Sequence, residues 1–185
     1  MNRPATPDDL FARLDSLGVA TRTYTHRPVF TVEESRDLRG EIPGLHCKSL
    51  FLKDKKEARW LVVAVEDRRL DLKLLAPLIG AARLSFASPE RLRAELGVEP
   101  GSVTPFALIN AAPGALGVVL DGAIETAELA NFHPLANHMT TAIRPDDLVR
   151  FISASGHRPA FVDLSPASAP ESAPGSFTTE SSTTS

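Results

Sequence analysis

Apolar residues recur at two spacings along the chain, and these spacings predict a mixture of helices and strands. Leu10, Leu14 and Leu17 lie on one helical face, after a helix start at Thr6 and before a stop at Gly18. Further helices are predicted at 31–38, 71–80, 88–97 and 145–156. Alternating or short continuous apolar runs predict strands at 19–26, 46–53, 60–65, 84–86, 105–110, 117–120, 139–143 and 160–164. Residues 132–135 are interpreted as an irregular connector.

The order of these elements predicts an α+β fold. The strands 46–53 and 60–65 are separated by a short charged turn, so we expect them to pair as an antiparallel hairpin. The chain lacks the regular strand–helix alternation of a doubly wound sheet, which favours a mixed, mostly antiparallel sheet flanked by helices. Residues 1–164 are expected to form one domain. Residues 165–185 are almost wholly Ser, Thr, Pro, Ala and Glu, and are expected to be a disordered tail.

Composition narrows the class of protein. Of 185 residues, 43% are hydrophobic and 23% are charged, which is typical of a soluble globular domain. There is one cysteine, Cys47, and no run approaches the roughly 18 to 20 apolar residues needed to cross a bilayer. The first ten residues do not resemble a signal peptide. We therefore expect a cytoplasmic protein that does not interact with membranes.

Charge is distributed unevenly. The formal net charge is −3, which argues against non-specific coating of DNA or RNA. The segment 48–73 holds eight Lys and Arg against five Asp and Glu, a net charge of +3, so the rest of the chain carries −6. Two interpretations of this segment stay open: a contact surface for a polyanion, or a solvated hairpin with mixed charges.

The strong motifs for nucleotide and metal sites are absent. There is no phosphate-binding glycine loop, no CxxC and no HExxH. His133 and His138 are separated by a proline and have no adjacent carboxylate, so we expect neither a metal nor a cofactor. Cys47, with histidines elsewhere in the chain, has the outline of a thiol hydrolase, although most free cysteines are buried apolar residues.

Three features are candidates for binding or chemistry. Lys48 falls on the same strand face as two leucines, so it either holds its cation at the mouth of an apolar pocket or extends its ammonium into water. The loop 100–105 offers backbone N–H groups around Gly101, Ser102 and Val103 that could hold an oxyanion, or it is an ordinary turn. His133, beside a proline, either positions a substrate or is structural.

Five segments taken in order resemble a known family. They are HCKSLFLKD (46–54), WLVVAVEDRRLD (60–71), LSFASPE (84–90), GSVTPFALIN (101–110) and NFHPLANHMTT (131–141). Together they resemble the YbaK/ProX family of free-standing aminoacyl-tRNA deacylases, and more closely its prolyl-tRNA editing branch. The resemblance runs from about Leu10 to Leu164.

The resemblance implies hydrolysis, in trans, of the ester that joins a wrong amino acid to the 3′ end of tRNA. Alanine on proline tRNA is the leading substrate, and Cys, Ser or Thr are the alternatives. The fold implied is a mixed sheet flanked by helices, with no metal. The family uses a lysine at the position of Lys48. The substrate-binding positions implied are Ser49, Gly101, Ser102, Val103, Thr104, His133 and Asn137.

The expected mechanism needs no protein nucleophile. Lys48 and the N–H groups near Ser102 would fix the ester and the terminal ribose, and water or the neighbouring ribose hydroxyl would attack the carbonyl. Ser49 is a departure, because the family lysine is usually followed by asparagine. The expected partners are aminoacyl-tRNA and prolyl-tRNA synthetase. A non-catalytic module that binds tRNA or a synthetase is the alternative.

Overall fold

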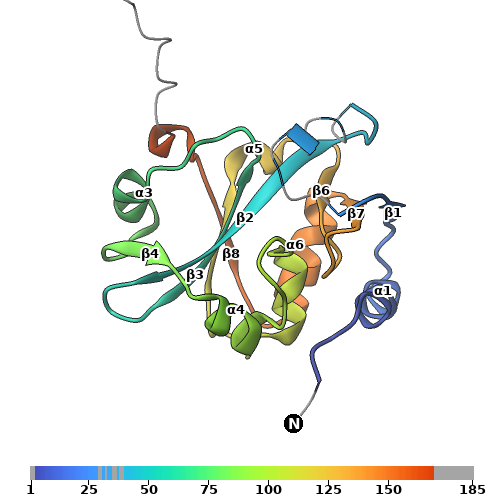
Figure 1. The fold of residues 1–185 in the computed structure, drawn as a ribbon, viewed down its shortest axis with the longest axis horizontal. Coiled ribbons are helices and arrows are strands. Elements are labelled where there is room, and N and C mark those ends of the chain that lie inside the picture. The colour runs from blue at the N-terminus through green and yellow to red at the C-terminus, as the bar shows by residue number, and fades with distance from the viewer. Residues whose placement is uncertain (1–2, 29–30, 32, 35–36, 38–39, 169–185) are drawn as a thin grey trace, which may run out of the picture.

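Strand β2 (Leu45–Asp54) is the centre of the fold (Figure 1). The computed structural model describes residues 3–28, 31, 33–34, 37 and 40–168. β2 pairs antiparallel with β3 (Arg59–Val65) and β4 (Leu84–Phe86), and parallel with β6 (Ala130–Phe132). It therefore connects two halves of one sheet.

Both halves continue outward from β2. Beyond β6 lie β7 (Met139–Ile143) and β1 (Arg22–Thr25), and beyond β3 lie β5 (Gly117–Asp121) and β8 (Pro159–Val162). The order is β1-β7-β6-β2-β3-β5-β8, with β4 also on β2. The pairs β2–β6, β3–β5 and β5–β8 are parallel, and the others are antiparallel. The predicted mixed sheet and its 46–53/60–65 hairpin are confirmed.

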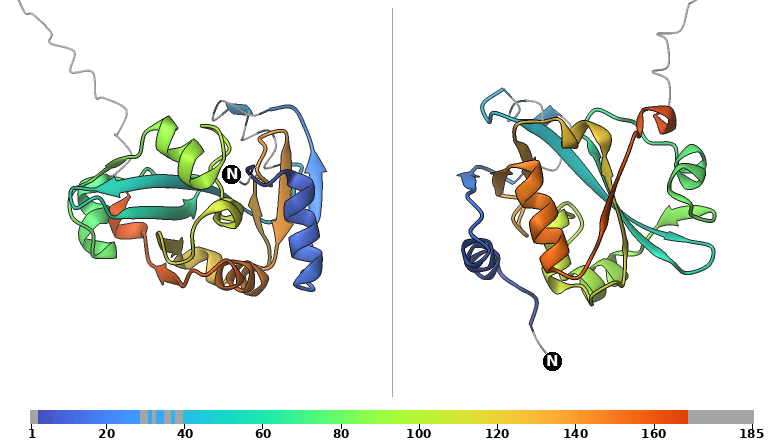
Figure 2. Two further views of the ribbon diagram at one scale, coloured as in Figure 1. Left: turned by 90° about the horizontal axis from the view of Figure 1, so that it is seen from below. Right: turned by 180° about the vertical axis from the view of Figure 1, so that it is seen from behind.

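Helices cover both faces and one end of this sheet. Figure 2 shows α6 along one side of the sheet and α1 at the end next to β1. The helices are α1 (Pro7–Ser16), α3 (Leu72–Ile79), α4 (Pro89–Leu96), α5 (Gly122–Glu125) and α6 (Pro145–Ala154). The predicted start of α1 is confirmed, because Thr6 and Asp9 form a reciprocal capping box. None of the helices in the described part of the chain has the length and apolar character needed to cross a membrane.

The sheet separates two cores, which explains why β3 is apolar at nearly every position. Leu61 and Val63 belong to the larger core, which also holds Leu14 of α1 and Phe151 of α6. Val62 and its alternate neighbours belong to a smaller core under α3. A strand that is buried on both faces cannot show the apolar–polar alternation of a half-exposed strand.

Some of the predicted elements were wrong. Residues Pro105–Asn110 form a 3₁₀ helix, η1, and not a strand. Pro105 lacks an N–H group, the Thr104 hydroxyl caps the Phe106 N–H, and the apolar run is buried among the helices of the larger core. The expected connector 132–135 begins inside β6, and α5 was not anticipated.

Other expectations fall at the margins of the described chain. The predicted helix 31–38 lies largely outside the described residues, although Thr31 and Glu34 form its expected capping contacts. The chain also stays packed past Leu164, where the tail was expected to begin. Ser165–Ala167 form a 3₁₀ turn, η2, in which Ala167 is buried in the smaller core. Residues 169–185 lie outside the described residues.

Candidate active site

Lys48 lies on the face of β2 that carries Leu50 and Leu52, as expected from alternation. It pairs with Ala64 of β3, and Leu52 is buried in the smaller core. The side chain is half-buried, and its Nζ donates a hydrogen bond to the carbonyl oxygen of Arg68. This contact holds the ammonium next to the chain segment that follows β3.

The charges around Lys48 act in opposite directions. Burial lowers its pKa, because it penalises the charged ammonium. The carboxylates of Glu66 and Asp67 oppose this effect, and the Arg69 guanidinium adds to it. The lysine is therefore a partly desolvated cation, which interacts more strongly with a substrate oxygen than an exposed lysine would.

Cys47 and Ser49 point to the opposite face of β2, toward the larger core. The Cys47 sulfur lies 3.7 Å from the Leu45 carbonyl oxygen, and the side chain packs against that core. Burial raises the pKa of the Cys47 thiol, and the carboxylates of Asp121 and Glu66 raise it further. Because the thiolate is the nucleophile, this environment argues against the thiol-hydrolase interpretation.

The loop 100–104 has fewer free amides than expected. The Ser102 N–H donates to the Glu99 carbonyl oxygen at 3.0 Å, which closes a turn. Thr104 is fully buried and caps η1. Ser102 is therefore not the available donor. The N–H groups of Gly101, Val103 and the buried Thr104 have no hydrogen-bond partner among the described residues, and those of Gly101 and Val103 are the less buried. These two amides remain candidates for holding a carbonyl oxygen.

His133 is half-buried directly after β6. Its Nδ1 lies 2.8 Å from the Met139 carbonyl oxygen, which can only accept, so Nδ1 carries the proton and Nε2 keeps a lone pair. Burial lowers the pKa of His133, the bond to Met139 opposes this, and nearby His26 lowers it further. The imidazole is therefore held in its neutral form.

His26 belongs to the same cluster and was not identified from the sequence. Its ring centroid lies 6.3 Å from that of His133, and its Nε2 lies 2.7 Å from the Thr140 hydroxyl. The pairing of Thr25 with Met139 brings the two histidines together across β1 and β7. No local sequence signal reveals this contact, because the two residues are far apart in the chain.

The pairing between β2 and β6 ends before Lys48 and His133. Its last pair is His46 with Asn131, and β6 stops at Phe132, so His133 is the first residue after the strand. Lys48 is two residues past His46 on β2 and, by alternation, faces the same side as His46. Lys48 and His133 therefore lie just beyond the point where two adjacent strands cease to pair.

Some of the remaining predicted site residues lie near the segment that follows His133, and others face the larger core. A methyl group built on Gly101 would lie 3.9 Å from Nδ2 of Asn137, so the loop 100–104 adjoins the segment that follows His133. Val103 packs against the larger core, and Ser49 faces it. The predicted site is thus assembled only in part: its loop and connector meet, while Ser49 points away from Lys48.

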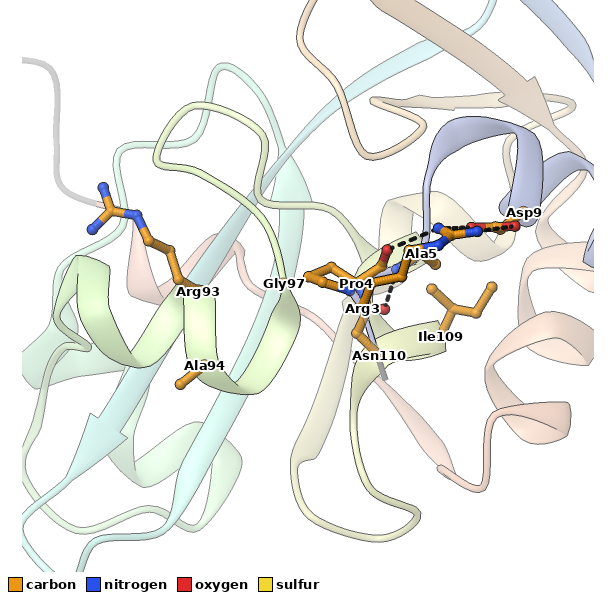
Figure 3. A pocket seen from close by; sticks show the side chains of 9 residues that line it. All are labelled: Arg3, Pro4, Ala5, Asp9, Arg93, Ala94, Gly97, Ile109 and Asn110. Carbon is orange, nitrogen blue, oxygen red and sulfur yellow. Dashed lines mark hydrogen bonds and ion pairs between the residues drawn. The ribbon is translucent and has the colours of Figure 1, made fainter. Parts of the chain in front are cut away.

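A separate cavity of about 480 Å³ lies elsewhere, between the N-terminal segment, α4 and η1 (Figure 3). Its two arginines are both paired with carboxylates, Arg3 with Asp9 and Arg93 with Glu99. None of the predicted site residues lines it. Over the described residues, there is also no group of three or more His, Cys, Asp or Glu that could hold a metal ion.

Comparison with known proteins identifies the fold as that of an editing domain. Residues 26–151 match the model of the aminoacyl-tRNA editing domain family, and the chain belongs to that family. It is 34% identical over 156 residues to the prolyl-tRNA editing protein ProX of Acetoanaerobium sticklandii, covering 84% of this chain and 95% of that protein.

Two further likenesses bear on specificity and fold. The multifunctional Ser/Thr-tRNA deacylase ProXp-y of Escherichia coli K12 is 33% identical over 104 residues, which cover 55% of this chain and 62% of that protein. The crystal structure of hypothetical protein APE2540 superposes with a TM-score of 0.65 at 22% identity, covering 83% of this chain and 97% of that one. The last likeness shows a shared fold.

Proposed function

We propose that this protein is a trans-editing hydrolase that removes a wrong amino acid from tRNA, with alanyl-tRNA for proline as its leading substrate. One observation carries the proposal. The half-buried ammonium of Lys48 and the imidazole of His133, whose pKa is lowered by burial, each lie two residues past the last pair between β2 and β6, and the loop at Gly101 adjoins Asn137 in the segment that follows His133. Family membership and the likeness to ProX support the same function.

The chemistry follows from what these groups can donate and accept. Lys48 and the N–H groups of Gly101 and Val103 hold the ester carbonyl and the terminal ribose, and so stabilise the negative charge that develops on the carbonyl oxygen. Water attacks the carbonyl carbon, either of the original ester or of the ester formed when the neighbouring ribose hydroxyl first takes over the acyl group. The C–O bond to the ribose breaks, the water oxygen becomes part of the released carboxylate, and the ribose oxygen takes up a proton from that water. The Nε2 lone pair of His133 accepts a hydrogen bond from the substrate.

No protein nucleophile takes part. The Cys47 thiol faces the larger core and has a raised pKa, so it is a poor source of thiolate. Hydrolysis therefore depends on positioning and electrostatics, which supply a large share of the rate acceleration in many enzymes.

The amino acid that is removed depends on the size and polarity of the pocket. A pocket can exclude larger side chains sterically. Against a side chain that is smaller by one methylene, it discriminates by only about 1–3 kcal/mol of binding free energy. Ser49 faces the larger core and so does not line a pocket beside Lys48, whereas the Escherichia coli relative is named for serine and threonine. Seryl and threonyl tRNA are accordingly the first competing substrates.

The partner is the acceptor end of tRNA, with prolyl-tRNA synthetase as a source of mischarged product, in the cytoplasm. Lys55 and Lys56 are exposed at the turn between β2 and β3, and supply positive charge for a polyanion. Other cations in the segment 48–73 are neutralised, because Arg59 pairs with Glu95 and Arg68 pairs with Asp121. The surface is therefore less basic than the sequence count suggests.

A deacylation panel tests the proposal. Purified protein is incubated with proline tRNA that carries alanine, cysteine, serine or threonine, and release of the amino acid is followed with and without EDTA. Alanine should be released fastest, with no effect of EDTA. Binding of tRNA without release of any amino acid would instead identify a non-catalytic module.

A further inference from the structure

Asp121, at the end of β5, is a carboxylate that is fully buried. Its two oxygens accept four hydrogen bonds: from Arg68 Nε at 2.5 Å and Nη2 at 3.2 Å, from the Val65 N–H at 3.1 Å and from the Ala123 N–H at 3.2 Å. A buried carboxylate without such partners would be strongly destabilising. The set of donors therefore satisfies both oxygens of Asp121 and fixes the position of its side chain.

Arg68 lies in the turn that follows β3. The carboxylate of Asp121 binds two nitrogens of its guanidinium, Nε and Nη2. Its own N–H donates to the Val65 carbonyl oxygen at 3.1 Å, so the backbone of the turn is fixed as well. A planar guanidinium bound by two parallel hydrogen bonds has little freedom to rotate. The carbonyl oxygen of Arg68 is consequently held in one place.

That carbonyl oxygen is the acceptor for Lys48. A chain of contacts thus runs from Asp121 on β5, through the side chain and then the backbone of Arg68, to the ammonium on β2. No local sequence feature links the three residues, since Asp121 lies 53 positions from Arg68 and Arg68 lies 20 positions from Lys48.

We propose that Asp121 and Arg68 are positioning residues for Lys48, and that they hold its ammonium in the orientation used for deacylation. This inference rests on the proposed function, in which Lys48 contacts the ester. A free lysine side chain samples many rotamers, and a catalytic group that is displaced by about 1 Å can lose roughly 100-fold in rate. One acceptor fixed by the fold selects among those rotamers and leaves two N–H donors for the substrate.

A purely structural role for Asp121 makes different predictions. The carboxylate also caps α5 through Ala123 and anchors the end of β3 through Val65, so its loss lowers stability in either case. Only a positioning role changes the mobility and reactivity of Lys48. The experiment therefore needs a readout at Lys48 itself and a control of equal burial.

The variants are Arg68→Met, which keeps most of the aliphatic stem, Arg68→Lys, which restores a charge without the fork, and Asp121→Asn, which is isosteric. The matched control is Asp54→Asn. Asp54 is also a buried carboxylate, 5% exposed, and it accepts bonds from the N–H groups of Lys56, Ala58 and Ala82. It lies at the far end of β2 from Lys48.

Two measurements are made on each variant. The first is brief labelling with acetic anhydride followed by peptide mass spectrometry, which gives the acetylation of Lys48 relative to the exposed Lys73 of the same molecule. The second is the single-turnover deacylation rate at saturating enzyme, with the affinity for uncharged tRNA measured separately. Circular dichroism and urea unfolding establish that each variant is folded.

Arg68→Met and Asp121→Asn should raise the labelling of Lys48 severalfold and lower the single-turnover rate roughly 10- to 100-fold, with unchanged affinity for tRNA. Arg68→Lys should partly restore the low labelling of Lys48 and the wild-type rate. Asp54→Asn should lower stability but change neither the labelling of Lys48 nor the single-turnover rate. Unchanged labelling of Lys48 or an unchanged rate in folded Arg68→Met and Asp121→Asn overturns the positioning role. Effects of the same size from Asp54→Asn on labelling and rate would overturn it as well. A wild-type protein without deacylase activity refutes the proposed function instead, and the labelling ratio still decides the geometry.

Discussion

The imidazole of His133 is bound through Nδ1 to the Met139 carbonyl oxygen at 2.8 Å, and this bond sets the role of the other nitrogen. With the proton on Nδ1, Nε2 can only accept a hydrogen bond while the ring is neutral. The strand pair β6–β7 places both residues, because His133 follows β6 and Met139 begins β7. The tautomer is thus determined by the sheet and not by the substrate.

His133→Asn should lower the single-turnover deacylation rate about tenfold. The Asn amide can still reach the Met139 carbonyl, but the acceptor at Nε2 is lost, and one hydrogen bond is worth about 1.5 kcal/mol. His138→Asn is the control, because His138 is exposed in the same segment. Equal rates for the wild type and His133→Asn would contradict a role in binding the substrate.

Stability should fall as the pH drops below about 6.5, the ordinary pKa of histidine. Burial lowers the pKa of His133 in the folded state, so between its folded and unfolded pKa values the unfolded chain binds more protons. Acidification in this window therefore favours unfolding. Urea unfolding between pH 7.5 and 5 measures the effect, and His133→Asn should make the dependence shallower. An identical pH dependence in the variant would argue against His133 as the source of the pH-dependent stability.

Lys48→Ala should abolish hydrolysis of alanyl-tRNA for proline and leave the fold intact. The side chain of Lys48 is only half-buried, so the change in the free energy of unfolding should stay within about 1 kcal/mol. Single-turnover assays and urea unfolding measure the two quantities, with the exposed Lys73→Ala as control. Undiminished turnover would remove Lys48 from the mechanism.

Cys47→Ser should retain nearly all deacylase activity. Because burial raises the pKa of the Cys47 thiol, alkylation by iodoacetamide at pH 8 should also be slow. The measurements are the deacylation rate of the variant and the time course of alkylation by mass spectrometry. Loss of activity in a folded Cys47→Ser protein would revive the thiol-hydrolase interpretation.

Gly101→Ala should reduce activity more than its effect on stability explains. Gly101 has φ +91°, and a side chain at positive φ costs about 1–2 kcal/mol, so the loop would shift to relieve this strain, although the new methyl would lie at an ordinary contact distance of 3.9 Å from Asn137 Nδ2. Gly18→Ala is the matched control, since Gly18 has φ +70° at the end of α1 and open space around it. Both variants should lose similar stability by urea unfolding, while only Gly101→Ala slows deacylation.

Local patterns predicted the regular parts of the fold and failed where contacts are distant. The face of Lys48 followed from alternation within β2, and the capping residues of α1 were recognisable from sequence alone. The apolar run 105–110 was misassigned because a short buried run has no diagnostic period. β6 was missed because three residues give no pattern, and its pairing with β2 is visible only in the fold.

In the candidate site, too, local features could be predicted and distant contacts could not. The site predicted from the residues and the resemblance comprises Lys48, the loop 101–104 and His133, but that prediction did not include the loss of the Ser102 N–H to the Glu99 carbonyl. Nor did it reveal Asp121 or His26, whose partners lie far away in the sequence. These contacts depend on how strands pack together, which a single sequence does not encode in any local spacing.

The junction between the two halves of the sheet also has a consequence for folding. β2 and β3 join through seven residue pairs across a short turn, whereas β2 and β6 join through only two pairs, each 85 positions apart in the sequence. Closing so long a loop for so few contacts is slow and comes after local pairing. The hairpin should therefore form early, and the pairing of β2 with β6 should be among the last native features to appear and the first to open in hydrogen exchange.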